Sequence, residues 1–254
     1  MFRTPRKLWL ATAVILTLAL VGCATGPKED PMAAEWDALQ AAKTALDAKR
    51  QELVALKAEA AMPVDPEAEG EPVDHTAHIE ALGAEVTGLA DGFMTQVVTF
   101  LNNDPIIAED GPTERQTAAI RLKSGEDMLV AEEWIAEGGD YSRAIQIYEN
   151  TLNLDPDNED LKAAMARAQE MRFMSAERFA TAKKGMTEDA VREALGTPLH
   201  YNVKTYPDKG GVTAWFYQTD EAGSAAAIWF RPNKEEILTA YLTKYDSVVK
   251  ESAE

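Results

Sequence analysis

The chain has 254 residues, of which 46% are hydrophobic and 7% aromatic, so it can bury a core in one or two domains. Its formal net charge is −18 at pH 7, with 43 acidic and 25 basic residues. So acidic a surface excludes nucleic acid as a partner, because it would repel the phosphates. With a single cysteine, no disulfide can form within the chain.

Residues 1–22 have the organisation of a secretory signal peptide, with three basic side chains before an apolar stretch that is too short to span a membrane. Residues 20–23 read Leu-Val-Gly-Cys and resemble the bacterial lipobox, in which the cysteine is acylated and becomes the new N-terminus. We therefore predict that Cys23 carries lipid and that residues 23–30 form a tether to the membrane. Ala24, in place of an aspartate that retains lipoproteins in the inner membrane, implies the periplasmic face of the outer membrane.

Residues 31–103 are predicted to form two long helices, joined by an acidic, proline-rich loop at residues 63–75. Asp30-Pro31 is typical of a helix start. The first helix has a seven-residue repeat of Leu39, Leu46 and Leu53. The second has an apolar stripe of Ile79, Leu82, Val86, Leu89, Phe93, Val97 and Phe100. Two helices joined by a loop favour an antiparallel hairpin within the chain, and a coiled coil with another chain is the alternative.

Residues 113–173 are predicted to be helical, with an interruption at Gly125 as an open alternative. Gly139-Asp140-Tyr141 is typical of a helix–helix turn, and this stretch resembles one tetratricopeptide repeat. The packing residues of its second helix would be Ala144, Ile145 and Tyr148. A further helix is predicted from Leu161, Met165 and Ala168. A lone repeat cannot bury its apolar face, so the pair is expected to pack on neighbouring parts of the chain.

A short helix is predicted at Glu188–Leu195, because both of its ends are marked. The Thr187 hydroxyl can accept a hydrogen bond from the first turn, and Gly196 suits the positive φ that follows a helix. Three β-favouring runs follow at residues 201–206, 212–218 and 225–230. The module at residues 174–249 is therefore predicted to be a helix on a three-stranded antiparallel sheet, and the whole chain to be α+β.

Five motifs occur in order within this module. They are Lys-Gly-Met-Thr at 184–187, Val191, Leu-Gly-Thr-Pro at 195–198, Trp-Phe-Tyr at 215–217 and Ile-Trp-Phe at 228–230. Together they resemble the SmpA/OmlA (BamE-like) family, a small lipoprotein component of the machinery that assembles outer-membrane β-barrels. The resemblance implies two helices on a three-stranded sheet. It also favours a strand for residues 236–249, whose apolar spacing fits a strand or a helix.

Four aromatic side chains of these strands are candidate partner-binding residues: Trp215, Tyr217, Trp229 and Phe230. If the helices cover these four side chains, they form the core of the module. Alternation along a strand would instead point Trp229 or Phe216 outward, as part of a partner-binding patch.

Catalytic motifs are absent: the sequence has no Gly-x-Ser-x-Gly, no His-Glu-x-x-His, no phosphate-binding loop and no dinucleotide-binding glycine pattern. His75 and His78 have a spacing that could bind a metal, but such a pair beside a loop is usually incidental. We predict neither enzyme activity nor a cofactor nor a metal.

The expected function is that of a scaffold or accessory factor in envelope assembly, anchored through Cys23, with outer-membrane β-barrel proteins as the clients that the resemblance implies. One alternative is a structural tether between the outer membrane and the cell wall, which would use the long first helix. A wall-attaching end is expected to be basic, whereas residues 251–254 read Glu-Ser-Ala-Glu. Another alternative is a periplasmic inhibitor, because a helix-on-sheet module resembles protein inhibitors of β-lactamase.

Replacing Cys23 with serine should abolish acylation, because the thiol is the lipid acceptor. The variant should leave the detergent phase on phase partitioning or accumulate as the uncleaved precursor, whereas Thr25→Ser should behave like the parent chain. A cleaved Cys23→Ser protein that still partitions into detergent would contradict the prediction.

Overall fold

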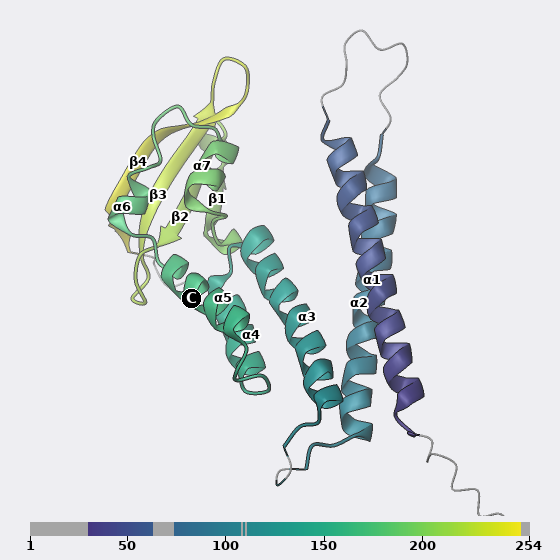
Figure 1. Cartoon of the computed structure of the whole chain (residues 1–254). Helices are drawn as coiled ribbons and strands as arrows, with labels where there is room; N and C mark the ends of the chain where they lie inside the picture. The colour runs from purple at the N-terminus through teal and green to yellow at the C-terminus, as the bar shows by residue number, and fades with distance from the viewer. Residues whose placement is uncertain (1–29, 63–73, 108, 110, 250–254) are drawn as a thin grey trace, which may run out of the picture.

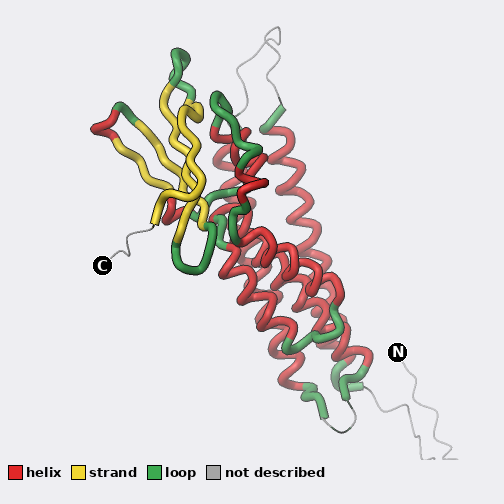
Figure 2. Tube along the Cα trace, turned by 90° about the vertical axis from the view of Figure 1, so that its left-hand side faces the viewer, coloured by secondary structure: helices red, strands yellow, loops and turns green. Residues whose placement is uncertain are grey.

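The computed structural model describes residues 30–62, 74–107, 109 and 111–249. Over these residues the chain is α+β, as predicted, with seven helices followed by one antiparallel sheet (Figure 1). Figure 2 shows the long helices side by side and the strands gathered at one end of them. The predicted signal peptide, Cys23 and most of the proline-rich loop lie outside the described residues. None of the helices described is both long enough and apolar enough to cross a membrane.

α1 (Ala33–Ala60) and α2 (Thr76–Asn103) form an antiparallel hairpin within the chain (Figure 1). Lys49 of α1 pairs with Glu85 of α2 at 3.3 Å. The seam is built from the predicted leucine repeat and apolar stripe, and its buried residues include Leu39, Leu46, Phe93, Val97 and Phe100. Each helix has 28 residues and is therefore about 42 Å long.

α1 begins two residues later than the Asp30-Pro31 start predicted from the sequence, with Met32 in place of Asp30 before its first residue. The Asp30 carboxylate accepts a hydrogen bond from the backbone N–H of Met32 at 3.0 Å, and the Ala33 N–H donates to the Asp30 carbonyl. Asp30 therefore holds a turn that leads into the helix and does not cap the helix itself.

α3 (Glu114–Gly138), α4 (Tyr141–Leu152) and α5 (Glu159–Arg172) form a second group of helices. Thr113 starts α3 with a capping box, as its place in the sequence suggested. The helix continues through Gly125 without interruption, because that glycine is exposed and the turns on either side of it are held by packing. The three helices share a core of Ala131, Ala144, Ile145, Tyr148, Leu161, Ala164 and Ala168.

A buried ion pair joins α3 to the hairpin. Both carboxylate oxygens of Glu126 accept hydrogen bonds from the Arg50 guanidinium, at 2.8 and 2.6 Å. Lys43 Nζ lies 3.7 Å from the same carboxylate. Glu126 is buried, so removing its partners would leave an uncompensated charge in the contact.

The sheet has four strands, one more than predicted. They are β1 (Val203–Tyr206), β2 (Val212–Gln218), β3 (Ser224–Pro232) and β4 (Leu238–Val249), paired in chain order. The fourth strand is the segment whose spacing fitted both a strand and a helix. β1 starts later than predicted because its first residues form a 3-10 turn, η1 (His200–Asn202). A second such turn, η2 (Pro207–Lys209), connects β1 to β2.

α6 (Ala176–Phe179) and α7 (Glu188–Leu195) pack on one face of this sheet (Figure 1). α7 has the predicted bounds: the Thr187 hydroxyl accepts a hydrogen bond from the N–H of Ala190, and Gly196 follows with a φ of 86°. The core between helices and sheet consists of Met174, Phe179, Ala182, Val191, Leu195, Trp215, Tyr217, Ala226, Ile228, Phe230 and Ala240.

The segment before α7 also pairs with the edge strand β4. The N–H of Ala240 donates to the Met186 carbonyl, and the N–H of Gly185 donates to the Ala240 carbonyl, both at 2.8 Å. Thr187 forms an isolated antiparallel bridge with Thr239. The first residues of β4 therefore have backbone partners on both sides.

Candidate functional site

The two faces of the sheet differ in chemistry. Cross-strand partners point their side chains to the same face. Trp215 pairs with Ile228 on the inner face, which α6 and α7 cover. Ala214 pairs with Trp229, and Trp229 with Leu242, on the other side. We call this second side the outer face, and among the described elements no helix lies over it (Figure 2).

Three of the four candidate partner-binding residues lie in the core. Trp215, Tyr217 and Phe230 are buried beneath the helices, so a partner could not contact them without displacing α6 or α7. The fold therefore corrects their proposed role to packing. Trp229 lies on the outer face, where it is partly exposed. Cys23, the predicted lipidation site, lies outside the described residues.

Two aromatic rings form the centre of the outer face. The ring centroids of Phe216 and Trp229 are 6.1 Å apart, and the rings meet edge to face. Leu242, which is 40% exposed, lies opposite Trp229 on β4. Three alanines form the floor beside these larger side chains: Ala214, Ala225 and Ala227. The result is an apolar surface that a partner could cover.

Three basic side chains lie on the outer face. Lys204 Nζ lies 5.8 Å from the Phe216 ring centroid, and the Arg231 guanidinium lies 5.1 Å from that of Tyr241. Lys244 shares the outer face with its strand neighbour Leu242. None of the ion pairs between described residues involves Lys204, Arg231 or Lys244. In a chain of net charge −18, the outer face thus carries three basic side chains.

Alternation along the strands offered an outward Trp229 or Phe216 as the alternative to a core role, and the three cations were missed. They come from three different strands, and only the register brings them to one face. A signal was available within β3, where Arg231 follows Trp229 by two residues and so must share its side.

A second feature is the close contact between the helical half and the sheet half. Gly139, in the turn between α3 and α4, has a φ of 62°, and a Cβ built there would lie 2.6 Å from the carbonyl carbon of Pro198 and 2.7 Å from the nitrogen of Leu199. The Thr197 hydroxyl donates to the carbonyl of Ala136 at 2.8 Å. The glycine of the predicted helix turn therefore touches the Leu-Gly-Thr-Pro exit of α7.

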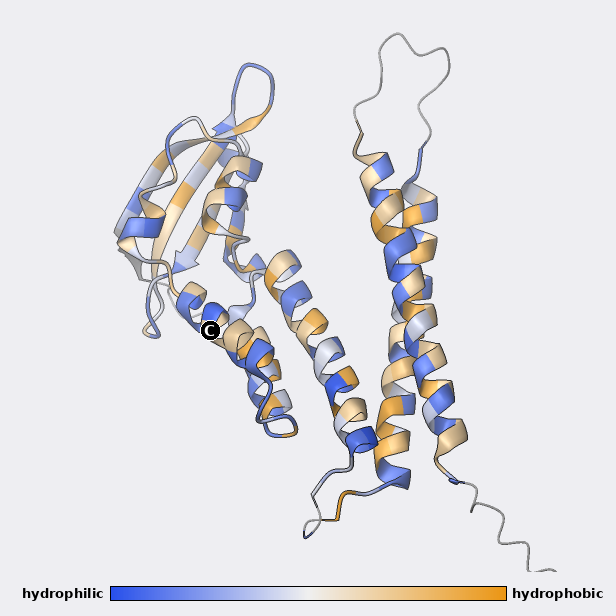
Figure 3. Ribbon diagram, in the orientation of Figure 1, coloured by the Kyte–Doolittle hydropathy of each residue, from blue (hydrophilic) through white to orange (hydrophobic). Residues whose placement is uncertain are grey.

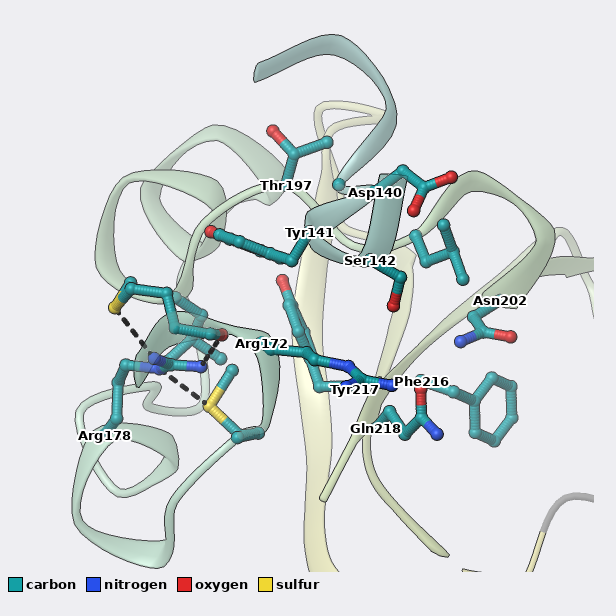
Figure 4. Close-up of a pocket in the computed structure, with 15 residues that line it drawn as sticks. Asp140, Tyr141, Ser142, Arg172, Arg178, Thr197, Asn202, Phe216, Tyr217 and Gln218 are labelled. Atoms are coloured by element: carbon teal, nitrogen blue, oxygen red, sulfur yellow. Dashed lines mark hydrogen bonds between the residues drawn. The ribbon is translucent and has the colours of Figure 1, made fainter. Parts of the chain in front are cut away.

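We call this contact the junction (Figure 4), and hydrogen bonds within the sheet half lie beside it. The Tyr217 hydroxyl donates to the Gly196 carbonyl at 3.0 Å, and the Met174 N–H donates to the Gln218 carbonyl at 2.8 Å. Burial raises the pKa of Tyr217. The cavity enclosed here has a volume of about 40 Å³, room for about one water molecule. The junction is therefore a packed interface between the two halves.

Arg178 holds the segment that enters the sheet half. Its guanidinium donates to the carbonyl of Met171 at 3.0 Å (Figure 4) and to that of Phe173 at 3.2 Å. These carbonyls lie at the C-terminal end of α5, where a cation compensates the negative end of the helix dipole. The segment that connects α5 to α6 is thus held in place by hydrogen bonds from the Arg178 side chain.

No group of three or more His, Cys, Asp or Glu side chains that could hold a metal ion occurs in the described part of the chain. His75 has Glu59 as a neighbour, with 4.0 Å between Nε2 and Oε1. No family model matches the chain, and no curated protein or solved structure is significantly similar to it.

Gly139→Ala should destabilise the fold by more than the roughly 1–2 kcal/mol that a left-handed backbone costs a non-glycine residue, because the added methyl would also overlap the backbone of Pro198 and Leu199. Gly210→Ala is the matched control, since Gly210 has a φ of 73° and open space around it. The free energy of unfolding is measured in denaturant. Equal losses for the two variants would mean that the junction accommodates the added methyl, and would contradict the prediction.

Stability should fall at alkaline pH, in part because of Tyr217. Its pKa is raised in the folded chain, so above about pH 10 the unfolded chain gives up this proton first and the free energy of unfolding falls as pH rises. Tyr217→Phe should lower stability near neutral pH by about 1 kcal/mol through the lost hydrogen bond to Gly196. It should also make the decline above pH 10 less steep, and an unchanged slope would contradict this assignment.

Proposed function

We propose that this chain is a lipid-anchored lipoprotein of the outer membrane that serves on the periplasmic side as a non-catalytic scaffold or accessory factor in envelope assembly. The lipobox-like residues 20–23 support the anchor. The five ordered motifs between residues 184 and 230 support a link to the assembly of outer-membrane β-barrels.

The observation that carries the proposal is the outer face. Phe216 and Trp229 are aromatic side chains that can bury a large area with few rotatable bonds to freeze, as binding hot spots do. The side chains of the neighbouring alanines are small, so they leave the space beside the two rings free for a partner. A scaffold needs a face of this kind, apolar at its centre and left open by the rest of the fold.

The cations define the chemistry of the partner. Lys204, Arg231 and Lys244 have no carboxylate partners among the described residues, so they can pair with acidic side chains on a bound protein. Charges at the rim of an interface act mainly on association rate and selectivity, and salt screens them. We therefore propose that the partner presents apolar and acidic side chains together.

Trp229→Ala tests the outer face in the native host. Because Trp229 is partly exposed, its loss should leave the fold intact and lower the unfolding free energy by less than the roughly 3–5 kcal/mol of a core tryptophan. Crosslinks from a photoreactive residue at position 242 to envelope proteins should disappear. Tyr201→Ala, which removes an exposed aromatic ring outside the strands, is the control and should keep them.

Lys204→Glu combined with Lys244→Glu should weaken the same crosslinks, and more strongly at low salt than at high salt. A stable Trp229→Ala chain that retains every crosslink would rule out the outer face as the interface. Unchanged amounts of outer-membrane β-barrel proteins after deletion of the whole gene would rule out the proposed role in their assembly.

A further inference from the structure

α3 carries an exposed apolar and acidic stripe on the side opposite its core face. Ala131 and Ile135 turn toward α4 and α5. The residues on the other side recur at helical spacing: Leu129, Val130, Glu133, Trp134 and Glu137. Leu129, Val130 and Trp134 are 44%, 45% and 41% exposed. We call these five residues the α3 stripe, and in Figure 3 hydrophobic and hydrophilic residues alternate along α3.

The α3 stripe faces the α1–α2 hairpin. It continues the side of α3 on which Glu126 holds Arg50 of α1. Beyond this ion pair, the hairpin and the C-terminal half of α3 diverge (Figure 1), which is why the side chains of the stripe are exposed. On α1, Val54 and Lys57 follow Arg50 by four and seven residues and so lie on the same side of that helix. Val54 is 67% exposed.

The charges on the α3 stripe favour a partner with basic side chains. Neither Glu133 nor Glu137 takes part in any ion pair between residues that the structure describes. The pKa of Arg50 is raised chiefly by its hydrogen bonds to Glu126, with a smaller contribution from Glu133, so that carboxylate faces the hairpin. A hollow of about 290 Å³ beside Trp134 is lined by Glu133, Glu137 and Gly138.

We propose that the α3 stripe binds an amphipathic helix of a partner protein, and that this helix carries lysine or arginine beside its apolar residues. Side chains at helical spacing form a ridge that packs into the groove of another helix. Trp134 would be the central aromatic anchor, and Glu133 and Glu137 would pair with the cations. A second copy of this chain does not supply this helix through its outer face, because the basic side chains there, Lys204, Arg231 and Lys244, lie on strands. The proposal stands independently of the outer face.

The test uses the full-length acylated protein in detergent and two fluorescent synthetic helices of about 16 residues, long enough to form in water. One has leucines at helical spacing flanked by lysines, and the other has glutamate in place of each lysine. Fluorescence anisotropy should show binding of the basic helix and at least about tenfold weaker binding of the acidic one.

Glu133→Lys combined with Glu137→Lys should weaken binding of the basic helix about tenfold, since two attractions become repulsions. Glu170→Lys combined with Glu193→Lys makes the same change of charge at exposed sites elsewhere and should leave the affinity within about twofold. Trp134→Ala should also weaken binding, whereas Val98→Ala, at an exposed apolar site on α2, should not. Equal binding of both helices, or equal loss in the control variant, would overturn the proposal.

A second measurement asks whether the hairpin itself covers the stripe. Val54→Cys combined with Val130→Cys can form a disulfide only if the two Cβ atoms approach to about 3.8 Å. Without a peptide the pair should stay reduced under mild oxidation, with each single variant as the control for disulfides between two molecules. Rapid formation of the intrachain disulfide would mean that α1 closes onto α3, and would overturn the proposal of a partner helix.

Discussion

Gly139 sets how the two halves of the chain meet. Backbone atoms of Pro198 and Leu199 occupy the space that a side chain at this position would need. The next residue, Asp140, caps α4 by accepting a hydrogen bond from the N–H of Arg143 at 2.9 Å, so the turn cannot shift without loss of the cap. The start of α4 and the exit of α7 are therefore fixed together, and the directions of the outer face and the α3 stripe follow from that contact.

The features that the sequence predicted are those with local causes. Capping chemistry at Thr187 and Gly196 placed both ends of α7, and the leucine repeat located the seam of the hairpin. The number of strands and the roles of the aromatic residues depend on pairing between distant segments. Trp215 and Trp229 stand in similar runs of sequence, yet register alone places one in the core and the other on the outer face. Gly125 left an interruption of α3 open, and the helix continues because the cost of a glycine within a helix, about 1 kcal/mol, is small beside the packing of the turns around it.

Net charge also describes this chain only as an average. The net charge is −18, yet Lys204, Arg231 and Lys244 gather on the outer face while Glu133 and Glu137 stand on the α3 stripe. Composition cannot reveal this, because the residues of each set come together through strand register or helix periodicity. Two open surfaces of opposite charge would let one chain bind two partners of different kinds, which fits the proposed role of a scaffold.

The pairing of residues 185–187 with the start of β4 affects the tendency of the protein to aggregate at high concentration. An open sheet edge is a template onto which another chain can add a strand. Here the backbone of Gly185 and Met186 already occupies one end of that edge, and β1, at the opposite side of the sheet, has only four residues. The bulge between Trp229 and Phe230 breaks the regular register of β4 further along. The same short segment that leads into α7 thereby also protects the sheet against aggregation.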